Sequence, residues 1–209
     1  RELAALGGCD DGDTLAAEPF MQVYSRWALA LSQLTEVLGQ YGDQAIMRPD
    51  KAHEVSVLNN RFQVRNGYIE ARSASLFTDQ PSALLEVFLL LEQNPQLQGV
   101  RAGTIRAIRE HRYLIDDDFR NDIRNRSLFM EIIRQPRRIT RELRRMDRYG
   151  ILAAYLPAFE HIVGLMQYDL FHVYTVDEHI LFVVRNLRRF TVQKHALEFP
   201  LCSHIVATL

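Results

Sequence analysis

The chain has 209 residues, 47% of them hydrophobic and 24% charged, and its formal net charge is −1 at pH 7. A chain of this length can bury one sizeable helical core or two small ones. The near-neutral net charge argues neither for nor against nucleic acid. No apolar run approaches the ~18–20 residues of a membrane-spanning helix, which excludes a transmembrane helix. We expect no membrane partner and no nucleic-acid partner.

The two cysteines, Cys9 and Cys202, are too few for a disulfide framework or a structural zinc site. This usage favours a reducing compartment, and we expect a cytoplasmic location. The first residues, Arg1-Glu2-Leu3-Ala4, lack the basic-then-apolar order of a signal peptide. A start at Arg1 without Met and an end at Leu209 inside an apolar stretch suggest a piece of a longer chain.

Residues 1–17 are expected to form a flexible acidic segment. Their glycines and aspartates, Gly7, Gly8, Asp10, Asp11, Gly12 and Asp13, favour a solvated loop over a metal site. After Pro19 the apolar residues recur at spacings of three and four, which predicts a helix that Gly39 and Gly42 end. We expect its stripe to belong to the core: Phe20, Tyr24, Trp27, Leu31, Leu34 and Leu38.

Residues 43–61 are polar and irregular, and a β-hairpin is predicted directly after them, at about 62–72. Two short alternating segments, 62–65 and 68–71, flank Asn66-Gly67. This dipeptide favours a type I′ turn, in which both central residues need positive φ. We expect this hairpin to be the only β element of the chain.

The chain after the hairpin is predicted to be helical. Pro81 opens the apolar block Ala83–Leu91, which we expect to be a central buried helix that Asn94-Pro95 ends. Thr104 is predicted to cap the next helix, and the aspartates 116–118 break the pattern. A further amphipathic helix is expected over Phe119, Ile123, Phe129, Ile132 and Ile133. The fold class is therefore mainly α: a multi-helix bundle of eight or so helices with one small hairpin.

A basic helix is predicted to begin at Pro136. Arginines at helical spacing place one positive face on it: Arg134, Arg138, Arg141, Arg145 and Arg148. Guanidinium groups can bind phosphate through bidentate hydrogen bonds. No aromatic residues interleave with them as a base-stacking surface requires. A solvated or interdomain face is favoured, with phosphate or partner binding as the alternative.

Thr175-Val176-Asp177-Glu178 has the pattern of a capping box and predicts the start of a helix. His179 then falls in its first turn, where we expect it beside the buried face, because Val176, Ile180 and Val183 form the apolar stripe. The helix dipole holds an imidazole there in the neutral form that a metal ligand needs. A single histidine does not close a metal site, so a half-buried structural histidine is the alternative.

The residues alone show no complete active site. His161, His172, His195 and His204 lack metal-ligand spacing to one another. The sequence also has no phosphate-binding glycine loop and no nucleophile-and-base pattern. The aspartates at 10–13 and 116–118 lack the strand and Gly-Ser turn of a nucleotidyltransferase carboxylate pair.

Three segments resemble the bacterial protein-PII uridylyltransferase/uridylyl-removing enzymes. The stretch 162–179, IVGLMQYDLFHVYTVDEH, is similar to the opening of the HD phosphohydrolase domain of that family. Phe20–Tyr24 with its helix, and Ser75–Thr78 leading to Pro81, resemble the helical region between its two catalytic domains. The similarity covers roughly residues 18–205.

This resemblance implies the domain organisation and the function. Residues 18–150 would be a helical connector that follows a nucleotidyltransferase domain, and 151–209 an incomplete N-terminal part of an HD domain. The family transfers UMP from UTP to a tyrosine of the PII signal protein and removes it again, under the control of glutamine. The resemblance implies a divalent metal, Mg or Mn, in the whole enzyme, with His179 as the first HD-domain ligand.

The sequence departs from the family pattern in one important respect. The HD domain takes further ligands from a His-Asp pair and another Asp, and no His-Asp dipeptide occurs in this chain. We therefore expect the 209 residues alone to be inactive and to bind no metal tightly. Two alternatives are open: a non-catalytic interaction module that docks PII through the arginine stripe, and a piece of another HD or nucleotidyltransferase enzyme.

Overall fold

The computed structural model describes residues 17–46, 55–136, 138–166 and 174–208, and the expected acidic segment 1–17 lies outside this range except for Ala17. The described part is mainly helical, as predicted, with one small sheet. Its hydrophobic core extends from Phe62 to Leu181 and is built mostly from the helices between the sheet and the C-terminal segment. None of the described helices is long and apolar enough to span a membrane.

The predicted hairpin is confirmed. Strands β2 (Phe62–Arg65) and β3 (Tyr68–Ala71) pair antiparallel, with Arg65 opposite Tyr68. Asn66 and Gly67 have φ values of 52° and 81°, as a type I′ turn requires. The predicted backbone chemistry of Asn-Gly therefore sets the turn.

The expectation that this hairpin is the only β element is wrong. β1 (Val55–Val57) pairs antiparallel with β2, and β4 (Gly99–Val100) pairs parallel with β3, which gives the order β1-β2-β3-β4. Neither added strand exceeds three residues, so neither has an alternation long enough to identify it. Both exist because the hairpin offers edges for them to pair with.

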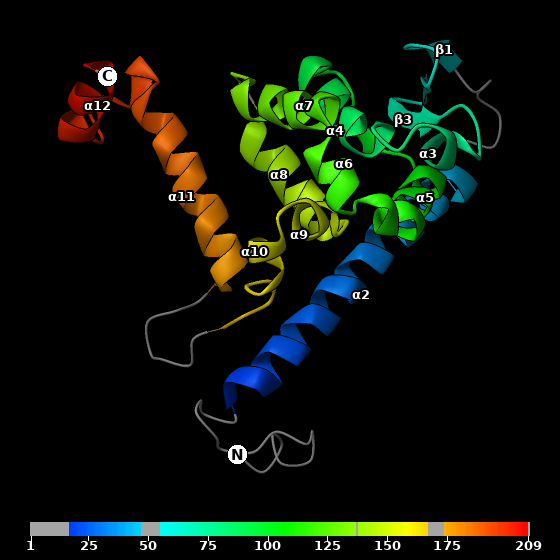
Figure 1. Cartoon of the computed structure of the whole chain (residues 1–209), viewed down its shortest axis with the longest axis horizontal. Coiled ribbons are helices and arrows are strands. Elements are labelled where there is room, and N and C mark those ends of the chain that lie inside the picture. Colours follow the sequence, from blue (N-terminus) through cyan, green and yellow to red (C-terminus); the bar gives the residue numbers. More distant parts are fainter. Residues whose placement is uncertain (1–16, 47–54, 137, 167–173, 209) are drawn as a thin grey trace.

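The helix predicted as central is α4 (Ala83–Gln93), and its burial is confirmed. Phe88 is fully buried, and its ring lies 6.1 Å from that of Tyr149. The short α3 (Leu76–Asp79) precedes it, and α7 (Ile123–Arg134) and α8 (Ile139–Arg148) pack against it. An all-round apolar sequence thus occupies the middle of the bundle (Figure 1).

Several predicted helix boundaries are corrected. α5 (Ala102–His111) begins two residues before Thr104, whose buried hydroxyl accepts a hydrogen bond from Ala71 N at 3.0 Å instead of capping the helix. A 3₁₀ turn, η1 (Arg112–Leu114), follows α5. The amphipathic helix expected over Phe119–Ile133 is two helices, α6 (Asp117–Asn121) and α7. They divide at Asp122, whose carboxylate caps α7 by accepting from Arg124 N at 2.7 Å.

The helix predicted after Pro19 is α2 (Ala17–Ile46), which reaches away from the body at its N-terminal end (Figure 1). Two predictions about it are wrong. It continues through Gly39 and Gly42, where a loss of about 1 kcal/mol per glycine is too small to end a helix of 30 residues. The apolar stripe is also exposed rather than in the core, except for Phe20, which is half-buried. The exposed stripe consists of Val23, Tyr24, Trp27, Leu31, Leu34, Leu38 and Tyr41.

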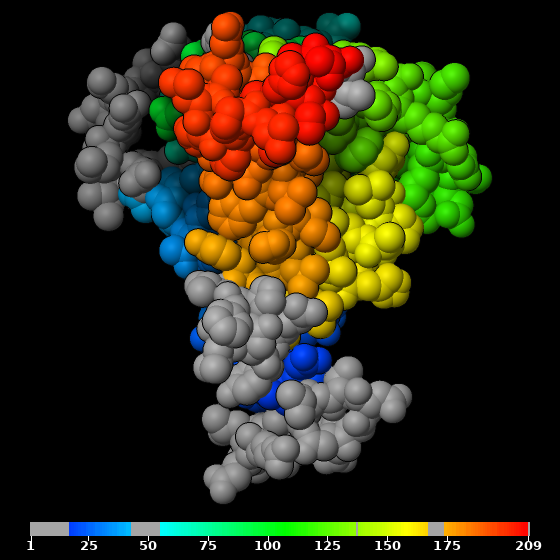
Figure 2. All heavy atoms as spheres, turned by 90° about the vertical axis from the view of Figure 1, so that its left-hand side faces the viewer, coloured from blue at the N-terminus to red at the C-terminus, as the bar shows by residue number. Residues whose placement is uncertain are grey.

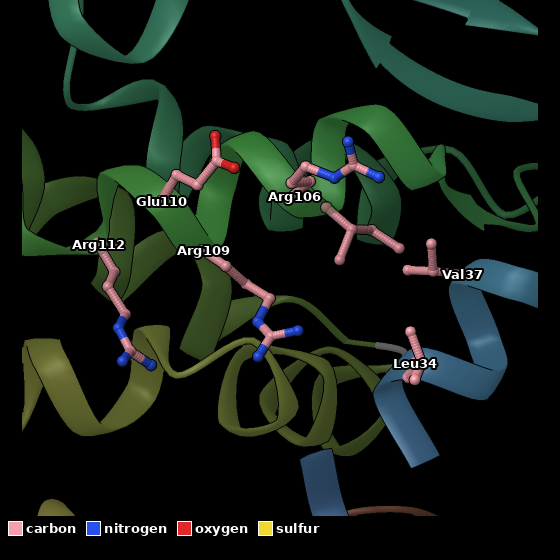
Figure 3. Close-up of a pocket in the computed structure, with 7 residues that line it drawn as sticks. Leu34, Val37, Arg106, Arg109, Glu110 and Arg112 are labelled. Atoms are coloured by element: carbon pink, nitrogen blue, oxygen red, sulfur yellow. The ribbon is translucent and has the colours of Figure 1, made fainter. Parts of the chain in front are cut away.

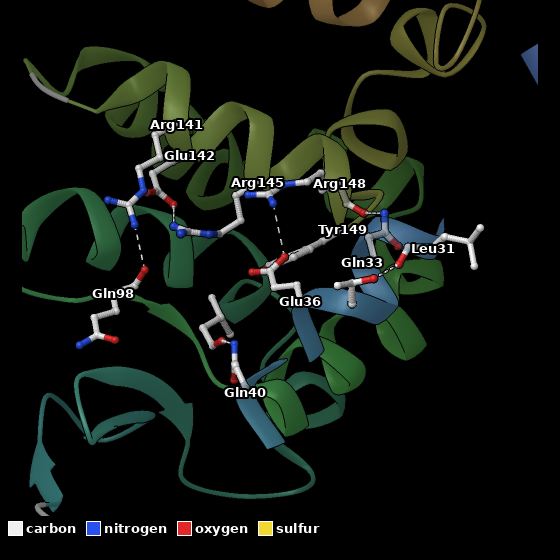
Figure 4. A network of polar contacts seen from close by, with 12 residues as sticks. Leu31, Gln33, Glu36, Gln40, Gln98, Arg141, Glu142, Arg145, Arg148 and Tyr149 are labelled. Carbon is white, nitrogen blue, oxygen red and sulfur yellow. Dashed lines mark hydrogen bonds and ion pairs between the residues drawn. The ribbon is translucent and has the colours of Figure 1, made fainter. Parts of the chain in front are cut away.

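The polar edge of α2, not its apolar stripe, faces the body (Figure 4). Gln33 and Gln40 are 6% and 9% exposed, whereas Trp27 is 68% exposed. Gln40 donates to Val100 O at 2.9 Å and accepts from Ala102 N at 2.7 Å, so it satisfies the backbone at the β4–α5 junction. Glu36 accepts from Tyr149 Oη at 3.3 Å. Polar contacts therefore hold this helix against the rest of the chain.

The C-terminal part consists of short helices and one longer helix. α9 (Ile151–Tyr155) and α10 (Pro157–Glu160) follow α8 closely. α11 (Val176–Phe190) packs against α8, and η2 (Gln193–His195) and α12 (Pro200–Ala207) come after it. Figure 2 shows α11, in orange, along one side of the molecule, with the red C-terminal elements above it.

Candidate functional site

The helix that carries His179 begins where the sequence predicts, because α11 starts at Val176 after the N-cap residue Thr175. The predicted capping box is wrong, since Thr175 makes no side-chain capping hydrogen bond. The Glu178 carboxylate lies 3.0 Å from Arg144 Nε of α8 instead. The carboxylate of Glu178 therefore contacts a tertiary partner on α8 and not the backbone of its own helix.

The start of α11 is tied to the preceding segment through Asp177. This buried carboxylate accepts hydrogen bonds from Gly164 N at 3.1 Å and from Glu178 N at 2.9 Å. Val176 N also donates to Leu165 O at 2.8 Å. Gly164 has a φ of 69°, which favours glycine. These bonds set the position and direction of the first turn of α11.

His179 is exposed at the surface of this first turn, so the expected position beside the buried face is wrong. The side chains of α11 that are buried are Asp177 and Leu181, two positions away on either side. An exposed imidazole at the start of a positioned helix can still contribute one ligand to a metal. His172, the nearest upstream histidine, lies outside the described residues.

The described residues do not by themselves form a metal site. Among them, no group of three or more His, Cys, Asp or Glu side chains is placed to hold a metal ion. The acids nearest His179 in the chain are engaged elsewhere, Asp177 with backbone amides and Glu178 with Arg144. The described residues therefore offer one candidate metal ligand, His179, and no catalytic step can be derived from one ligand.

Two buried acids, Asp147 of α8 and Asp177 of α11, lie near the start of α11, and no pattern in the sequence singled them out. Burial, together with the negative charges of Asp177 and Glu178, raises the pKa of Asp147 to about 7. The Oδ1 atom of Asp147 is buried and has no hydrogen-bond partner among the described residues. Only the packing of α8 on α11 brings Asp147 and Asp177 together, because thirty positions separate them in the chain.

The predicted basic helix is two helices. Arg134 ends α7, and Arg138 precedes α8 with a φ of 66°, so the arginine stripe turns a corner between them. Arg145 is buried and pairs with the buried Glu142, whereas Arg141 donates to Gln98 O at 2.8 Å (Figure 4). The stripe is therefore not one solvated face: Arg145 is a core residue, and the others line a cleft beside α11.

A second hollow, of about 350 Å³, lies between α2 and α5 (Figure 3). Leu34, Val37 and Ile105 supply its apolar surface, and Arg106, Arg109 and Glu110 lie around it. The apolar part of this hollow continues into the exposed stripe of α2. It holds no arrangement of groups that suggests chemistry.

The chain is similar to part of a known group of enzymes along nearly all its length. The family described as the uridylyltransferase GlnD third domain matches residues 62–155. The bifunctional uridylyltransferase/uridylyl-removing enzyme of Nitrosococcus oceani is 58% identical over 200 residues, which is 96% of this chain and 22% of that protein. This chain is homologous to a part of that enzyme.

Other relatives with the same description agree. The Azotobacter vinelandii enzyme is 50% identical over 210 residues, which covers 100% of this chain and 23% of that protein. The Pseudomonas aeruginosa enzyme is 48% identical over 210 residues, which also covers 100% of this chain and 23% of that protein. The chain thus spans less than a quarter of the curated relatives that it matches. No solved structure matches it.

The comparisons confirm the resemblance drawn from residues 18–205. They cover the α2 and α11 segments as well as the 62–155 region. The comparisons do not favour the alternative that the chain is a piece of another HD or nucleotidyltransferase enzyme.

Proposed function

We propose that this chain is an internal part of a longer cytoplasmic enzyme that uridylylates a PII signal protein and removes the uridylyl group in response to glutamine. The observation that supports this is the 48–58% identity to uridylyltransferase/uridylyl-removing enzymes over 96–100% of the chain. UTP and UMP would be the nucleotide substrate and product, and Mg or Mn the metal. The 209 residues alone would be inactive, since they provide one candidate ligand.

Within this proposal, residues 18–150 form the connector after a nucleotidyltransferase domain, and 151–209 begin the HD domain. His179 would ligate the metal used for uridylyl removal. It is exposed on the first turn of α11, and other parts of the longer protein would supply the remaining ligands of the metal. The Asp177 carboxylate, which accepts from Gly164 N, and the Leu165 carbonyl, which accepts from Val176 N, fix that turn in place.

The test is His179→Ala in the full-length protein, with UMP release from uridylylated PII and UMP transfer to PII measured separately. Loss of an outer-shell partner of a metal typically lowers activity ~10–100-fold, so loss of a ligand should lower release by more than about 100-fold. Transfer should be almost unchanged. His161→Ala, which removes another exposed imidazole, is the matched control and should retain both activities. Equal loss of both activities in His179→Ala would contradict the ligand role.

A second proposal concerns the connector itself: the exposed apolar stripe of α2 docks another domain of the same longer protein. The residues of the stripe, from Val23 to Tyr41, lie along one face of α2. This face points away from the body because Gln33, Glu36 and Gln40 on the opposite edge contact the body. Monomeric proteins rarely expose apolar patches this continuous. More than three quarters of the length of the relatives lies outside the matched part. A domain from that remaining length is the partner that we propose for the stripe.

Trp27 gives a direct test because it is the only tryptophan of the 209 residues. Its fluorescence should be readily quenched by iodide in the 209-residue chain, where the side chain is 68% exposed. In the full-length protein the quenching of Trp27, isolated by subtracting the Trp27→Phe variant, should be several-fold weaker. Equal quenching in the two chains would show that no domain covers the stripe.

A further inference from the structure

A strongly positive cleft of about 1000 Å³ lies between α8 and the C-terminal half of α11. It continues from the end of α7 to η2. Its charged lining comes from both sides of the helix pair: Arg134, Arg138, Arg141, Arg144, Arg148, Arg185, Arg188, Arg189, Lys194 and His195. No Asp or Glu is among the described residues that line it. The sequence prediction included part of one wall, and the tertiary structure adds the other.

Some of these cations are neutralised by acids outside the cleft. Arg134 lies 3.1 Å from Glu131, Arg144 lies 3.0 Å from Glu178, and Arg189 pairs with Glu198. Such pairs at a protein surface are weak, so an anion of higher charge can compete for the guanidinium groups.

Four cations of the cleft have no such partner. Within the described part of the chain, no carboxylate lies within ion-pair distance of Arg138, Arg185, Arg188 or Lys194. Arg188 instead donates to the carbonyl oxygens of Ile133 and Gln135. Among the described residues, the cleft therefore keeps an excess of positive charge.

The fold holds several of these groups in place. Arg144 and Arg185 lie 4.6 and 4.7 Å from the centre of the Phe182 ring, one from each helix. Cation–π contacts of this kind restrain long side chains. The hydrogen bonds of Arg188 join α11 to the turn after α7. The positive groups are thus partly ordered before any ligand arrives, which lowers the entropy lost on binding.

We infer that this cleft binds a small anion with adjacent phosphate groups, such as the polyphosphate part of a nucleotide. Eight of its nine formal cations are arginines, whose planar forks match phosphate oxygens in pairs. A hollow of this size admits a compact, highly charged group. No Phe, Tyr or Trp is among the described lining residues, so bases have no surface on which to stack, which disfavours single-stranded nucleic acid.

The experiment is calorimetric titration of the 209-residue chain with inorganic triphosphate at low salt. One equivalent should bind, and the affinity should fall as salt rises, because charge contacts dominate. ATP and UTP should bind within about threefold of triphosphate, because no base contact contributes. Absence of saturable triphosphate binding would overturn the inference.

Variants locate the site. Arg138→Gln combined with Arg185→Gln removes two cations without a carboxylate partner, and should weaken binding at least about tenfold, since each guanidinium makes charge-assisted hydrogen bonds to the anion. Arg72→Gln combined with Arg124→Gln is the matched control: it removes the same charge from exposed positions outside the cleft and should bind like the parent chain. Equal weakening in both doubles would show a general charge effect and overturn the site.

Two further controls complete the experiment: binding of two competing ligands, and measurement of the folded structure of each variant. An oligonucleotide or a poly-glutamate peptide that binds the cleft more than about tenfold tighter than triphosphate would assign it to nucleic acid or to an acidic protein surface, against the inference. Circular dichroism and thermal unfolding of each variant identify any loss of structure. If the double variant unfolds, Lys194→Gln, at an exposed position, tests the same cleft and should weaken triphosphate binding measurably.

Discussion

Helices α4 and α2 are both rich in apolar residues, yet the fold buries one set and exposes much of the other. α4 buries eight of its eleven residues, including Leu84, Leu85 and Phe88. α2 turns its apolar stripe outward and its glutamines inward, so that Trp27 and Leu31 are 68% and 62% exposed. Apolar periodicity therefore identifies a face that needs covering, and the neighbours available decide whether this chain covers it.

The largest expected effect is in α4. Phe88→Ala removes a fully buried ring that packs near Tyr149, and should lower the free energy of unfolding by about 3–5 kcal/mol. Urea denaturation followed by circular dichroism measures this. Tyr24→Ala on α2 removes an aromatic ring that is exposed, and serves as the control. A similar loss for both variants would show that the stripe of α2 is buried in solution.

The buried acid at the end of α4 should make stability depend on pH. Burial, together with the negative charge of Glu142, raises the pKa of Glu92 to about 8. Between about pH 4.5 and pH 8 the folded chain then holds a proton that the unfolded chain has lost. The free energy of unfolding should fall as the pH rises through this window, by up to about 1.4 kcal/mol per pH unit.

Glu92→Gln should remove much of this slope and stabilise the chain at pH 8 by about 2–3 kcal/mol, measured by urea denaturation at several pH values. The pKa of Asp147 is raised to about 7, so the interval from pH 7 to pH 8 reports mainly on Glu92. Glu131→Gln, on an exposed carboxylate, should leave the slope unchanged. A Glu92→Gln chain with the parental slope above pH 7 would contradict the assignment.

On α2 the loss of a polar side chain should destabilise the chain more than the loss of an apolar one, the reverse of the usual order. Gln40→Ala leaves Val100 O and Ala102 N without their partners, and should destabilise the chain by about 1–3 kcal/mol. Leu38→Ala, two residues away on the exposed stripe, should change stability by less than about 0.5 kcal/mol. Thermal unfolding of the pair decides the point. A larger loss for Leu38→Ala would mean that the helix packs through its apolar face.

The smallest effect is expected for the centre of the stripe. Trp27→Ser combined with Leu31→Ser should change the unfolding free energy of the 209-residue chain by less than about 0.5 kcal/mol per site. It should also reduce self-association, measured by analytical ultracentrifugation, because exposed apolar patches promote it. A strongly destabilised double variant would remove the contrast between α2 and α4.

Much of the fold was predictable from local chemistry. Asn66-Gly67 set the hairpin, since few other dipeptides accept two positive φ values. The block after Pro81 gave the buried helix, and Thr175 marked the start of α11. The site was less predictable: the position of His179 in the first turn of α11 is right, but its exposure was missed. Its role as a metal ligand stays a prediction.

The sequence by itself determined the secondary structure of the hairpin, the central helix α4 and the beginning of α11, because periodicity and φ preferences act between residues close in the chain. Only the tertiary structure decided which edge of α2 faces inward, that Glu178 pairs with Arg144 instead of capping its own helix, and that arginines from α8 and α11 share one cleft. Those outcomes depend on partners tens of residues away, whose hydrogen bonds and charges outweigh the local preferences.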